Sequence, residues 1–213
     1  MKYDKKIEEG SEVYMPAIHT RLRFGQLVEE ENFPRVQIYQ ETGTILVAPY
    51  VQTKNQIWIY AVHESRFTLH NSETINLPQG FIEKGENPLQ AAKREIREEM
   101  GIEIVEDQLF LLAQNLVPDV SFYDYREVTP EKPPYGNNFF GLDVSDYIIK
   151  QSESEINNNT QPQIDSQYYK GLKLDETETI SGGEFFPLET ILQNPQTPSV
   201  AGAALLFYKL KNQ

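Results

Sequence analysis

Several residue types are scarce or missing in this chain of 213 residues. Cysteine is absent, which excludes disulfides, thiolate zinc sites, iron–sulfur clusters and cysteine nucleophiles. Only three histidines occur, which disfavours a metal site built from several imidazole rings. The longest apolar stretch, Val200 to Tyr208, is far shorter than the roughly 20 residues that cross a membrane. The first ten residues carry charges but no apolar segment, so we expect a cytoplasmic protein without a membrane partner.

Positive charge is also scarce. The 19 lysines and arginines face 32 acidic residues, which gives a formal net charge of -13. Such an acidic surface is a poor non-specific partner for nucleic acid or for an anionic membrane. A phosphate-bearing substrate would therefore need accompanying cations, and metal ions are the expected ones. The apolar content of 39% still allows a sizeable core, which favours a globular domain over a disordered chain.

Residues 1–40 are predicted to be an N-terminal strand extension. Strand patterns occur at residues 18–24 and 35–39, and residues 29–32 are interpreted as a polar turn. The extension contains too little apolar material for a core of its own. We therefore expect it to pack on the remainder of the chain.

Residues 41–213 are predicted to form the main domain, of the α/β class. Strand and helix patterns follow one another at 44–51, 56–63, 88–100 (helix), 109–116, 138–143, 184–186 and 199–210 (helix). Strands with interleaved helices are typical of layered α/β proteins. Residues 118–137 form a long loop, and the Asn/Gln-rich residues 150–170 predict a mobile surface insertion.

The helix predicted at residues 88–100 has both of its ends specified by local chemistry. Asn87 is a good N-cap residue, and Pro88 suits the first helical position. Gln90 stands at the third position, where it completes a capping box. Gly101 is placed to end the helix in the left-handed conformation.

One face of this helix is apolar, and the neighbouring face carries acids. The apolar stripe contains Leu89, Ala92, Ile96 and Met100. Glu95, Glu98 and Glu99 stand at spacings of three and four residues, where like charges destabilise a helix by about a few tenths of a kcal/mol per pair. Arg94 can pair with Glu98 and offsets only part of this cost. Local rules are broken in this way at functional sites, and converging carboxylates are what Mg²⁺ requires. The alternative is an ordinary solvated helix.

The run from Gly80 to Ile102 follows the pattern G-x5-E-x7-R-E-U-x-E-E-x-G-U, where U is an aliphatic residue. Every defined position is occupied, by Gly80, Glu86, Arg94, Glu95, Ile96, Glu98, Glu99, Gly101 and Ile102. This pattern is the Nudix box, and the chain is identified by it as a member of the Nudix hydrolase family. The resemblance implies an α/β/α sandwich around a mixed β-sheet. It also implies hydrolysis of a nucleoside diphosphate linked to another moiety, with two to three Mg²⁺ or Mn²⁺ ions per active site.

The resemblance implies roles for the box residues by position. Glu95 and Glu99 correspond to the principal metal ligands, and Glu98 to a further, catalytically important ligand that often acts through water. The backbone carbonyl of Gly80 corresponds to another metal contact. Glu86 corresponds to a loop acid near the outer metal shell.

Arg94 corresponds to the residue that orients these glutamates by ion pairing. The chemistry is consistent with this arrangement, because the charge of a pyrophosphate repels an attacking water. Divalent ions neutralise that charge, polarise phosphorus and lower the pKa of the water.

Positions outside the box resemble the ADP-ribose pyrophosphatase subgroup. Pro118 lies sixteen residues after Ile102, a spacing similar to that subgroup. Arg66 matches an arginine that lies near the substrate phosphates, and either Glu176 or Glu178 matches a catalytic-base glutamate. The subgroup resemblance also implies a homodimer to which the N-terminal extension contributes.

Other features leave the substrate open. The turn before the box reads Pro78-Gln79-Gly80, as in relatives that act on dinucleoside polyphosphates or RNA 5′ ends. The tyrosine that those dinucleoside enzymes carry is replaced by Asp119, and the net charge disfavours RNA. We expect hydrolysis of ADP-ribose to AMP and ribose 5-phosphate. The alternatives are a dinucleoside polyphosphate, another nucleoside diphosphate sugar, or a non-catalytic nucleotide-sensing module, which the intact box disfavours.

Overall fold

The computed structural model divides the chain into two compact units, residues 1–43 with 115–137 and residues 44–114 with 138–213. The structure describes residues 3–7, 11–15, 18–22, 25–30, 33–39, 43–66, 72–83, 85–116, 137–152, 155, 160–174, 180–193 and 197–212. The domain boundaries at residues 40 and 41 stay a prediction.

The strands described in the first unit are short and antiparallel. One sheet has the order β1-β4-β5, with bounds Tyr3–Ile7, Gly25–Glu30 and Phe33–Tyr39. A second sheet pairs β2 (Ser11–Met15) with β3 (Ile18–Leu22). The polar turn predicted at residues 29–32 is wrong in its first half. Glu29 and Glu30 belong to β4 and pair with Val36 and Phe33, so pairing between strands overrides their low strand propensity.

The second unit is built on a seven-stranded mixed sheet. Its strands are β6 (Thr44–Gln52), β7 (Ile57–Arg66), β8 (Ser72–Asn76), β9 (Gln79–Phe81), β10 (Leu109–Leu116), β11 (Asn137–Asp143) and β12 (Ile180–Pro187). The order is β10-β11-β6-β7-β12, while β8 pairs with β7 and β9 with β6. The antiparallel β6–β9 pair brings Gly80 opposite Ile45 on a central strand, which places the first box residue against the sheet.

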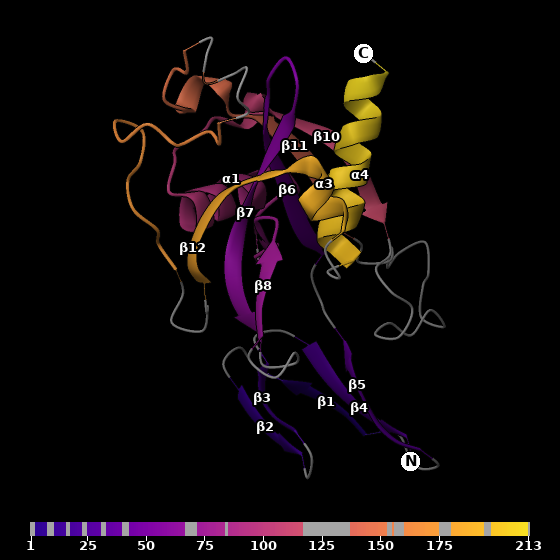
Figure 1. Ribbon diagram of the computed structural model, residues 1–213. Coiled ribbons are helices and arrows are strands. Elements are labelled where there is room, and N and C mark those ends of the chain that lie inside the picture. The colour runs from indigo at the N-terminus through magenta and orange to yellow at the C-terminus, as the bar shows by residue number, and fades with distance from the viewer. Residues whose placement is uncertain are drawn as a thin grey trace. The chain divides into compact units, whose positions relative to one another are not determined.

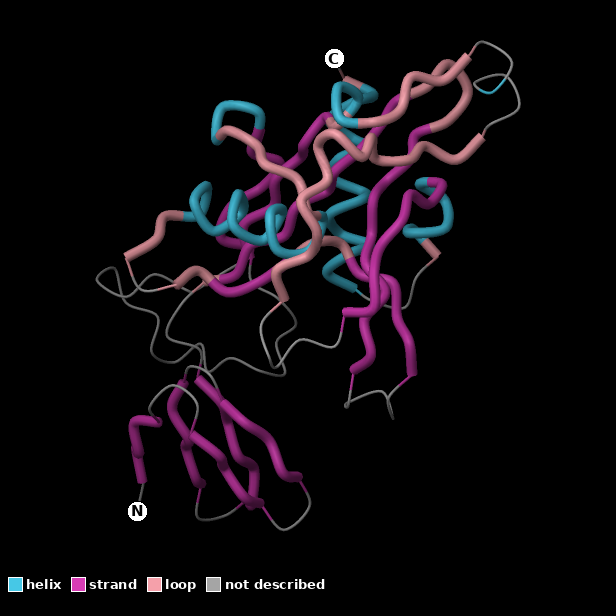
Figure 2. The backbone as a smooth tube through the Cα atoms, turned by 90° about the vertical axis from the view of Figure 1, so that its left-hand side faces the viewer, coloured by secondary structure: helices cyan, strands magenta, loops and turns pink. Residues whose placement is uncertain are grey.

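Helices cover both faces of this sheet (Figures 1 and 2). Helix α1 (Pro88–Glu95) continues as a π-helical turn, Ile96–Met100, and packs on one face. Helices α3 (Leu188–Leu192) and α4 (Thr197–Lys211) pack on the other, and short 3₁₀ turns lie at Glu106–Gln108 and Ser145–Tyr147. This arrangement confirms the predicted α/β class and the α/β/α sandwich with an N-terminal strand extension.

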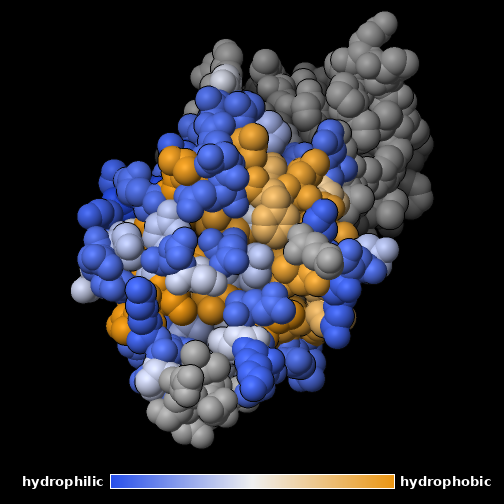
Figure 3. All heavy atoms as spheres, turned by 90° about the horizontal axis from the view of Figure 1, so that it is seen from above, coloured by the Kyte–Doolittle hydropathy of each residue, from blue (hydrophilic) through white to orange (hydrophobic). Residues whose placement is uncertain are grey.

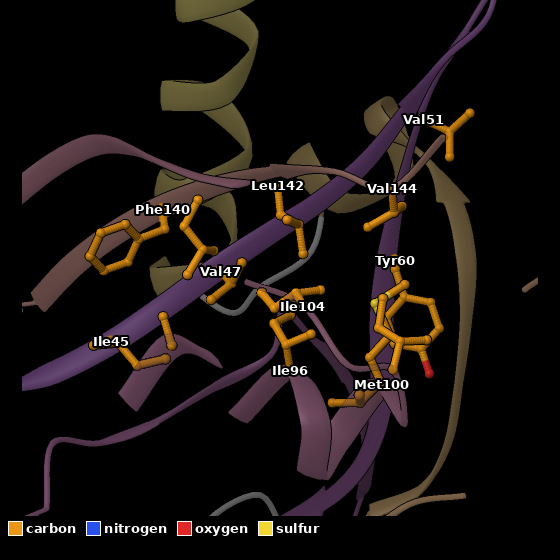
Figure 4. Packing of buried hydrophobic residues seen from close by; sticks show 14 of the residues in the cluster. Ile45, Val47, Val51, Tyr60, Ile96, Met100, Ile104, Phe140, Leu142 and Val144 are labelled. Atoms are coloured by element: carbon orange, nitrogen blue, oxygen red, sulfur yellow. The ribbon is translucent and has the colours of Figure 1, made fainter. Parts of the chain in front are cut away.

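The core has two layers because side chains alternate along each strand and both faces of β6 and β7 are buried. Ile45 and Val47 of β6 and Tyr60 of β7 pack against Ile96 and Met100 of the box helix (Figure 4). On the opposite face the buried cluster contains Leu46, Ala48, Ile59, Ala61, Leu188, Ile191, Ala203 and Leu206. The helix that carries the box is therefore fixed by its apolar stripe, as the sequence pattern predicted.

The outer surface mixes hydrophilic and apolar side chains on the face shown in Figure 3. Tyr208 near the end of α4 is the most exposed of the large hydrophobic residues that are described, at 71%. Within the described ranges, no helix combines the length and the apolar character needed to cross a bilayer.

Candidate active site

The start and the end of the box helix are fixed by hydrogen bonds and by backbone conformation. The Asn87 side chain accepts from the amides of Leu89 (2.9 Å) and Gln90 (3.0 Å), and Gln90 Oε1 accepts from the Asn87 amide (3.0 Å). This is the predicted capping box. Gly101 ends the helix at φ 73°, in the left-handed region that favours glycine. The register of the glutamates along the helix is therefore set at both ends.

The last turn of the helix differs from the sequence-based prediction. Residues 96–100 form a π-helical turn, in which hydrogen bonds span one residue more than in an α-helix. Glu95 keeps the position around the helix axis that a regular α-helix gives it. Glu98 and Glu99 do not, because they lie in the wider turn. Such single π-helical turns occur frequently at functional sites.

One guanidinium group joins three of the box carboxylates. Arg94 Nη1 donates to Glu95 Oε1 (2.6 Å) and to Glu98 Oε2 (2.9 Å), and Nε donates to Glu86 Oε1 (3.0 Å). Its Nη2 donates to the carbonyl of Phe81 at 2.7 Å. The planar fork of an arginine suits several carboxylates at once, which a lysine could not match. Arg94 thus holds the acids of the loop and of the helix in one cluster.

Glu95 and Glu99 are buried against strand β9. Their exposed fractions are 3% and 4%. A Cβ atom added to Gly80 would overlap Glu95 Oε1, so any larger residue there would have to displace this carboxylate. Glu99 Oε2 accepts from the Gln79 amide at 3.3 Å. The structure therefore brings Gly80, Glu95 and Glu99 together, whereas their role as metal contacts stays a prediction.

The electrostatics of the cluster favour charged side chains. Burial raises the pKa of Glu86, but hydrogen bonds from Arg94 and from the Glu83 amide outweigh it and lower that pKa below its ordinary value. Burial lowers the pKa of Arg94, but its bonds to Glu86 and the charge of Glu95 raise it well above the ordinary range. When ionised, four carboxylates outnumber one guanidinium, and a divalent cation would balance the excess.

The donor chemistry of the site fits a divalent ion. Carboxylates and the Gly80 carbonyl are hard oxygen ligands of the kind that Mg²⁺ and Mn²⁺ prefer. The space left by the missing Cβ of Gly80 holds the Glu95 carboxylate. In the part of the chain that is described, no three acidic or histidine side chains converge as a ready-made metal site. Arg94 holds oxygens of Glu95 and Glu98, so metal binding would compete with Arg94 for these atoms.

The remaining predicted site residues are outside what the structure describes in side-chain detail. Arg66 is the last residue of β7, where it pairs with Ser72 of β8, but its side chain is not described. Pro118, Glu176 and Glu178 lie outside the described residues. Their roles in substrate binding and proton transfer stay predictions.

Sequence analysis missed the backbone groups that complete the cluster. The amide of Gln79 and the carbonyl of Phe81 flank Gly80 and bond to Glu99 and Arg94. The hydroxyl of Tyr60 lies 3.5 Å from the Glu99 carbonyl. Proximity to Gly80 was the only signal for Gln79 and Phe81, because a backbone group contributes no side-chain pattern.

The chain matches a known protein family over most of its length. Residues 42–204 match the NUDIX domain family, which is most of the chain. The chain belongs to the Nudix family, whose enzymes generally use divalent metal ions and act on small nucleotide substrates. A comparison with curated proteins gave no match.

Solved structures of similar fold share little sequence with this chain. A crystal structure described as an ADP compounds hydrolase is 17% identical over 98% of both chains, with a TM-score of 0.53. The NUDIX domain of Shewanella oneidensis NrtR, complexed with ADP ribose, is 15% identical over 85% of this chain and 93% of that one, with a TM-score of 0.48. A C. elegans Ap4A hydrolase is 16% identical over 81% and 99%, with a TM-score of 0.42. At such identities the likeness concerns the fold alone.

Proposed function

We propose that this protein hydrolyses the pyrophosphate bond of a nucleoside diphosphate derivative with the help of two to three Mg²⁺ or Mn²⁺ ions. The observation that carries the proposal is the cluster in which Arg94 joins Glu86, Glu95 and Glu98 next to Gly80. When bound, the ions neutralise the substrate charge and lower the pKa of the attacking water. A net-negative protein needs such cations to hold an anionic substrate.

The residues of the chain have distinct tasks in this proposal. Glu95 and Glu99 would hold the ions, because both carboxylates lie beside β9 and are shielded from bulk water. The carbonyl of Gly80 would be a further ligand. The side chain of Glu98 is 26% exposed and is the most accessible of the three helix acids. It would hold a further ion on the substrate side. Arg94 would keep the carboxylates oriented.

The substrate that we propose is ADP-ribose, cleaved to AMP and ribose 5-phosphate. A structure that shares this fold over its full length is described as an ADP compounds hydrolase, and an ADP derivative is the substrate class that we propose here as well. The positions of Arg66 and Pro118 resemble the ADP-ribose pyrophosphatase subgroup and support the same substrate. The Pro-Gln-Gly sequence that ends at Gly80 instead favours a dinucleoside polyphosphate, which is the second candidate; another nucleoside diphosphate sugar is a third.

A carboxylate outside the box is proposed as the general base. The box glutamates are committed to the ions, so the proton of the attacking water needs another acceptor. Glu176 or Glu178, just before β12, is our candidate.

We further propose a cytoplasmic homodimer whose interface includes residues 1–40. A monomer in light scattering at tens of micromolar protein would contradict the dimer.

A substrate panel tests the proposed activity. ADP-ribose, diadenosine tetraphosphate, NADH and GDP-mannose are incubated with the protein and Mg²⁺ or Mn²⁺, and the products are quantified after phosphatase treatment. We expect the highest kcat/KM for ADP-ribose. A value about tenfold higher for diadenosine tetraphosphate would overturn the choice of substrate but not the chemistry. Tight ADP-ribose binding without turnover of any compound would instead favour the nucleotide-sensing module.

A further inference from the structure

Residues 160–174, which we name the strap, connect an edge of the sheet to the end of the box helix. Near its start, Gln161 Nε2 donates to Glu184 Oε2 (2.7 Å) and to the carbonyl of Phe185 (2.6 Å) on β12, the terminal strand in the sheet order. Near its end, Arg97 Nη1 donates to the carbonyl of Gly171 at 2.7 Å. The strap is therefore bonded to both elements.

The middle of the strap is held by a neighbouring segment. The amide of Asp165 donates to the carbonyl of Tyr147 at 2.9 Å, and an isolated bridge joins Ile148 to Ile164. The rings of Tyr147 and Tyr168 meet edge to face with centroids 5.2 Å apart. Sequence analysis predicted a mobile insertion over residues 150–170. That mobility stays a prediction, and the hydrogen-exchange measurement below tests it for the strap.

The strap supplies hydrogen-bond donors to the carbonyl groups at the end of the box helix. The last carbonyls of a helix have no partner within the helix. The amide of Lys173 donates to the Glu98 carbonyl (3.0 Å), and the amide of Lys170 donates to the Gly101 carbonyl (2.7 Å). The first of these bonds holds the peptide of a candidate metal ligand.

The strap also packs directly on Gly101, the glycine that ends the box helix. A Cβ atom added to Gly101 would lie 2.6 Å from Tyr169 Cε2 and 3.2 Å from the carbonyl oxygen of Gly171. The positive φ favours glycine at this position, and any side chain there would have to displace the Tyr169 ring. The end of the box helix and the strap are therefore closely packed.

Arg97 is the side chain that joins the strap to the helix. It occupies the position between Ile96 and Glu98 that the box pattern leaves undefined, and its side chain is only 15% exposed. Its Nε donates to Glu103 at 3.1 Å, but Glu103 is 63% exposed, and exposed ion pairs contribute little. A charged donor to a carbonyl makes a stronger hydrogen bond than a neutral one. We therefore attribute the main effect of Arg97 to its bond with Gly171.

We propose that the strap holds the π-helical turn in the conformation in which Glu98 and Glu99 bind metal, and that Arg97 is the positioning residue that fastens it. The catalytic consequence rests on the proposed function, whereas the effect on metal affinity does not require turnover. Groups that orient metal ligands from the outer shell typically change metal affinity or activity by about 10–100-fold.

Three variants of the full chain separate this role from simple stabilisation. Arg97→Met keeps an apolar stem and removes the donors. Arg97→Lys retains one donor for the Gly171 carbonyl. Glu103→Gln removes the charge of the surface ion pair and is the matched control. Each is assayed for Mn²⁺ affinity without substrate by electron paramagnetic resonance, for amide hydrogen exchange in the strap, and for kcat and KM with ADP-ribose.

We expect Arg97→Met to weaken Mn²⁺ binding by about 10-fold or more and to speed exchange in residues 160–174. Its kcat should fall by a similar factor, while KM changes by less than about threefold. Arg97→Lys should recover most of the Mn²⁺ affinity, and Glu103→Gln should behave as the wild type. A wild-type protein that does not hydrolyse ADP-ribose would contradict the proposed substrate, whereas the Mn²⁺ and exchange results would still support the role of the strap.

Faster exchange in the strap with wild-type Mn²⁺ affinity and wild-type kcat in Arg97→Met would overturn the proposal, because the strap would then be only a surface covering. If Arg97→Met does not fold, Gly171→Ala takes its place. Gly171 has φ 80°, and an added Cβ would meet no atom within 4 Å, so the change strains the strap backbone without touching the helix. The same loss of Mn²⁺ affinity is expected, and its absence would overturn the proposal.

Discussion

Replacing Gly80 with alanine would put a methyl group where the Glu95 carboxylate now lies. The new Cβ would be 1.8 Å from Glu95 Oε1 and 2.3 Å from its Cδ, whereas ordinary contacts begin at 3.4 Å. The φ angle of Gly80 is not positive, so alanine brings no backbone strain there. The effect of the substitution is therefore steric and falls on one identified carboxylate.

Glu95 has little freedom to avoid this methyl group. It is 3% exposed, and its Oε1, the atom nearest to the new Cβ, accepts from Arg94 at 2.6 Å. The carboxylate must be displaced by about 1.6 Å, the gap between 1.8 and 3.4 Å. Overpacking of this kind typically costs about 1–3 kcal/mol of stability. Misplacing a positioned group by about 1 Å can cost about 10²-fold in rate.

We therefore expect Gly80→Ala to lower kcat for ADP-ribose by about 10²-fold or more and to lower the free energy of unfolding by about 1–3 kcal/mol. Steady-state kinetics and urea denaturation measure the two effects. Gly202→Ala is the control, because its Cβ would press on Leu46 Cδ2 at 2.6 Å in the opposite core layer. That variant should keep kcat within about twofold of the wild type. Wild-type kcat and stability in Gly80→Ala would refute the described position of Glu95.

Four further predictions concern charged residues of the proposed site. Arg94→Lys cannot reach three carboxylates at once and should lower kcat by about 10–100-fold in steady-state assays. The pKa of Glu86 lies below its ordinary 4.5, because bonds from Arg94 and the Glu83 amide outweigh burial. Ionised Glu86 therefore stabilises the fold above that value and loses this effect as pH falls through its lowered pKa. In urea denaturation, the stability gap between wild type and Glu86→Gln should be largest at neutral pH and shrink below about pH 4.5; a constant gap would contradict it. One of Glu176→Gln or Glu178→Gln should lower kcat by about 10²-fold, while Arg66→Ala should raise KM for ADP-ribose; unchanged kcat in both glutamate variants would place the base elsewhere.

The box helix was the most predictable part of the fold because its signals are local. The capping residues Asn87 and Gln90, the apolar stripe and the terminal Gly101 each act within one or two turns of the helix. The π-helical turn was not predictable, since its end is held by the distant amides of Lys170 and Lys173. The conformation of the last turn therefore depends on tertiary contacts, whereas that of the first two turns follows from local sequence.

The strands followed a similar division. Leu109–Leu116 was predicted with the bounds of β10, and the apolar runs of β6 and β7 were found to within three residues. Strands β8 and β9 were missed, because β9 has three residues and β8 reads SETIN, which alternates weakly. Such strands exist through their pairing with β7 and β6, which a single local pattern does not reveal.

The candidate site divides between side chains and backbone. The pattern from Gly80 to Ile102 predicted the acids and Arg94 as site residues, because these residues act through their side chains. The contributions of the Gln79 amide and of the strap carbonyl at Gly171 were not visible, since any residue has these groups. Composition predicted a polar insertion for the strap but could not predict what its backbone touches.

One comparison tests the proposed chemistry directly. ADP-ribose hydrolysis is measured for the wild type, Glu99→Gln and Glu103→Gln, each with Mg²⁺ and with EDTA. Glu99 is 4% exposed beside Gln79, whereas Glu103 is an exposed acid on the same segment. We expect equal Mg²⁺-dependent rates for the wild type and Glu103→Gln. Neither protein should hydrolyse ADP-ribose in EDTA. Glu99→Gln should remain folded by circular dichroism and lose at least about 10²-fold in kcat. A wild-type rate in Glu99→Gln, or full activity of the wild type in EDTA, would contradict metal-dependent hydrolysis at this site.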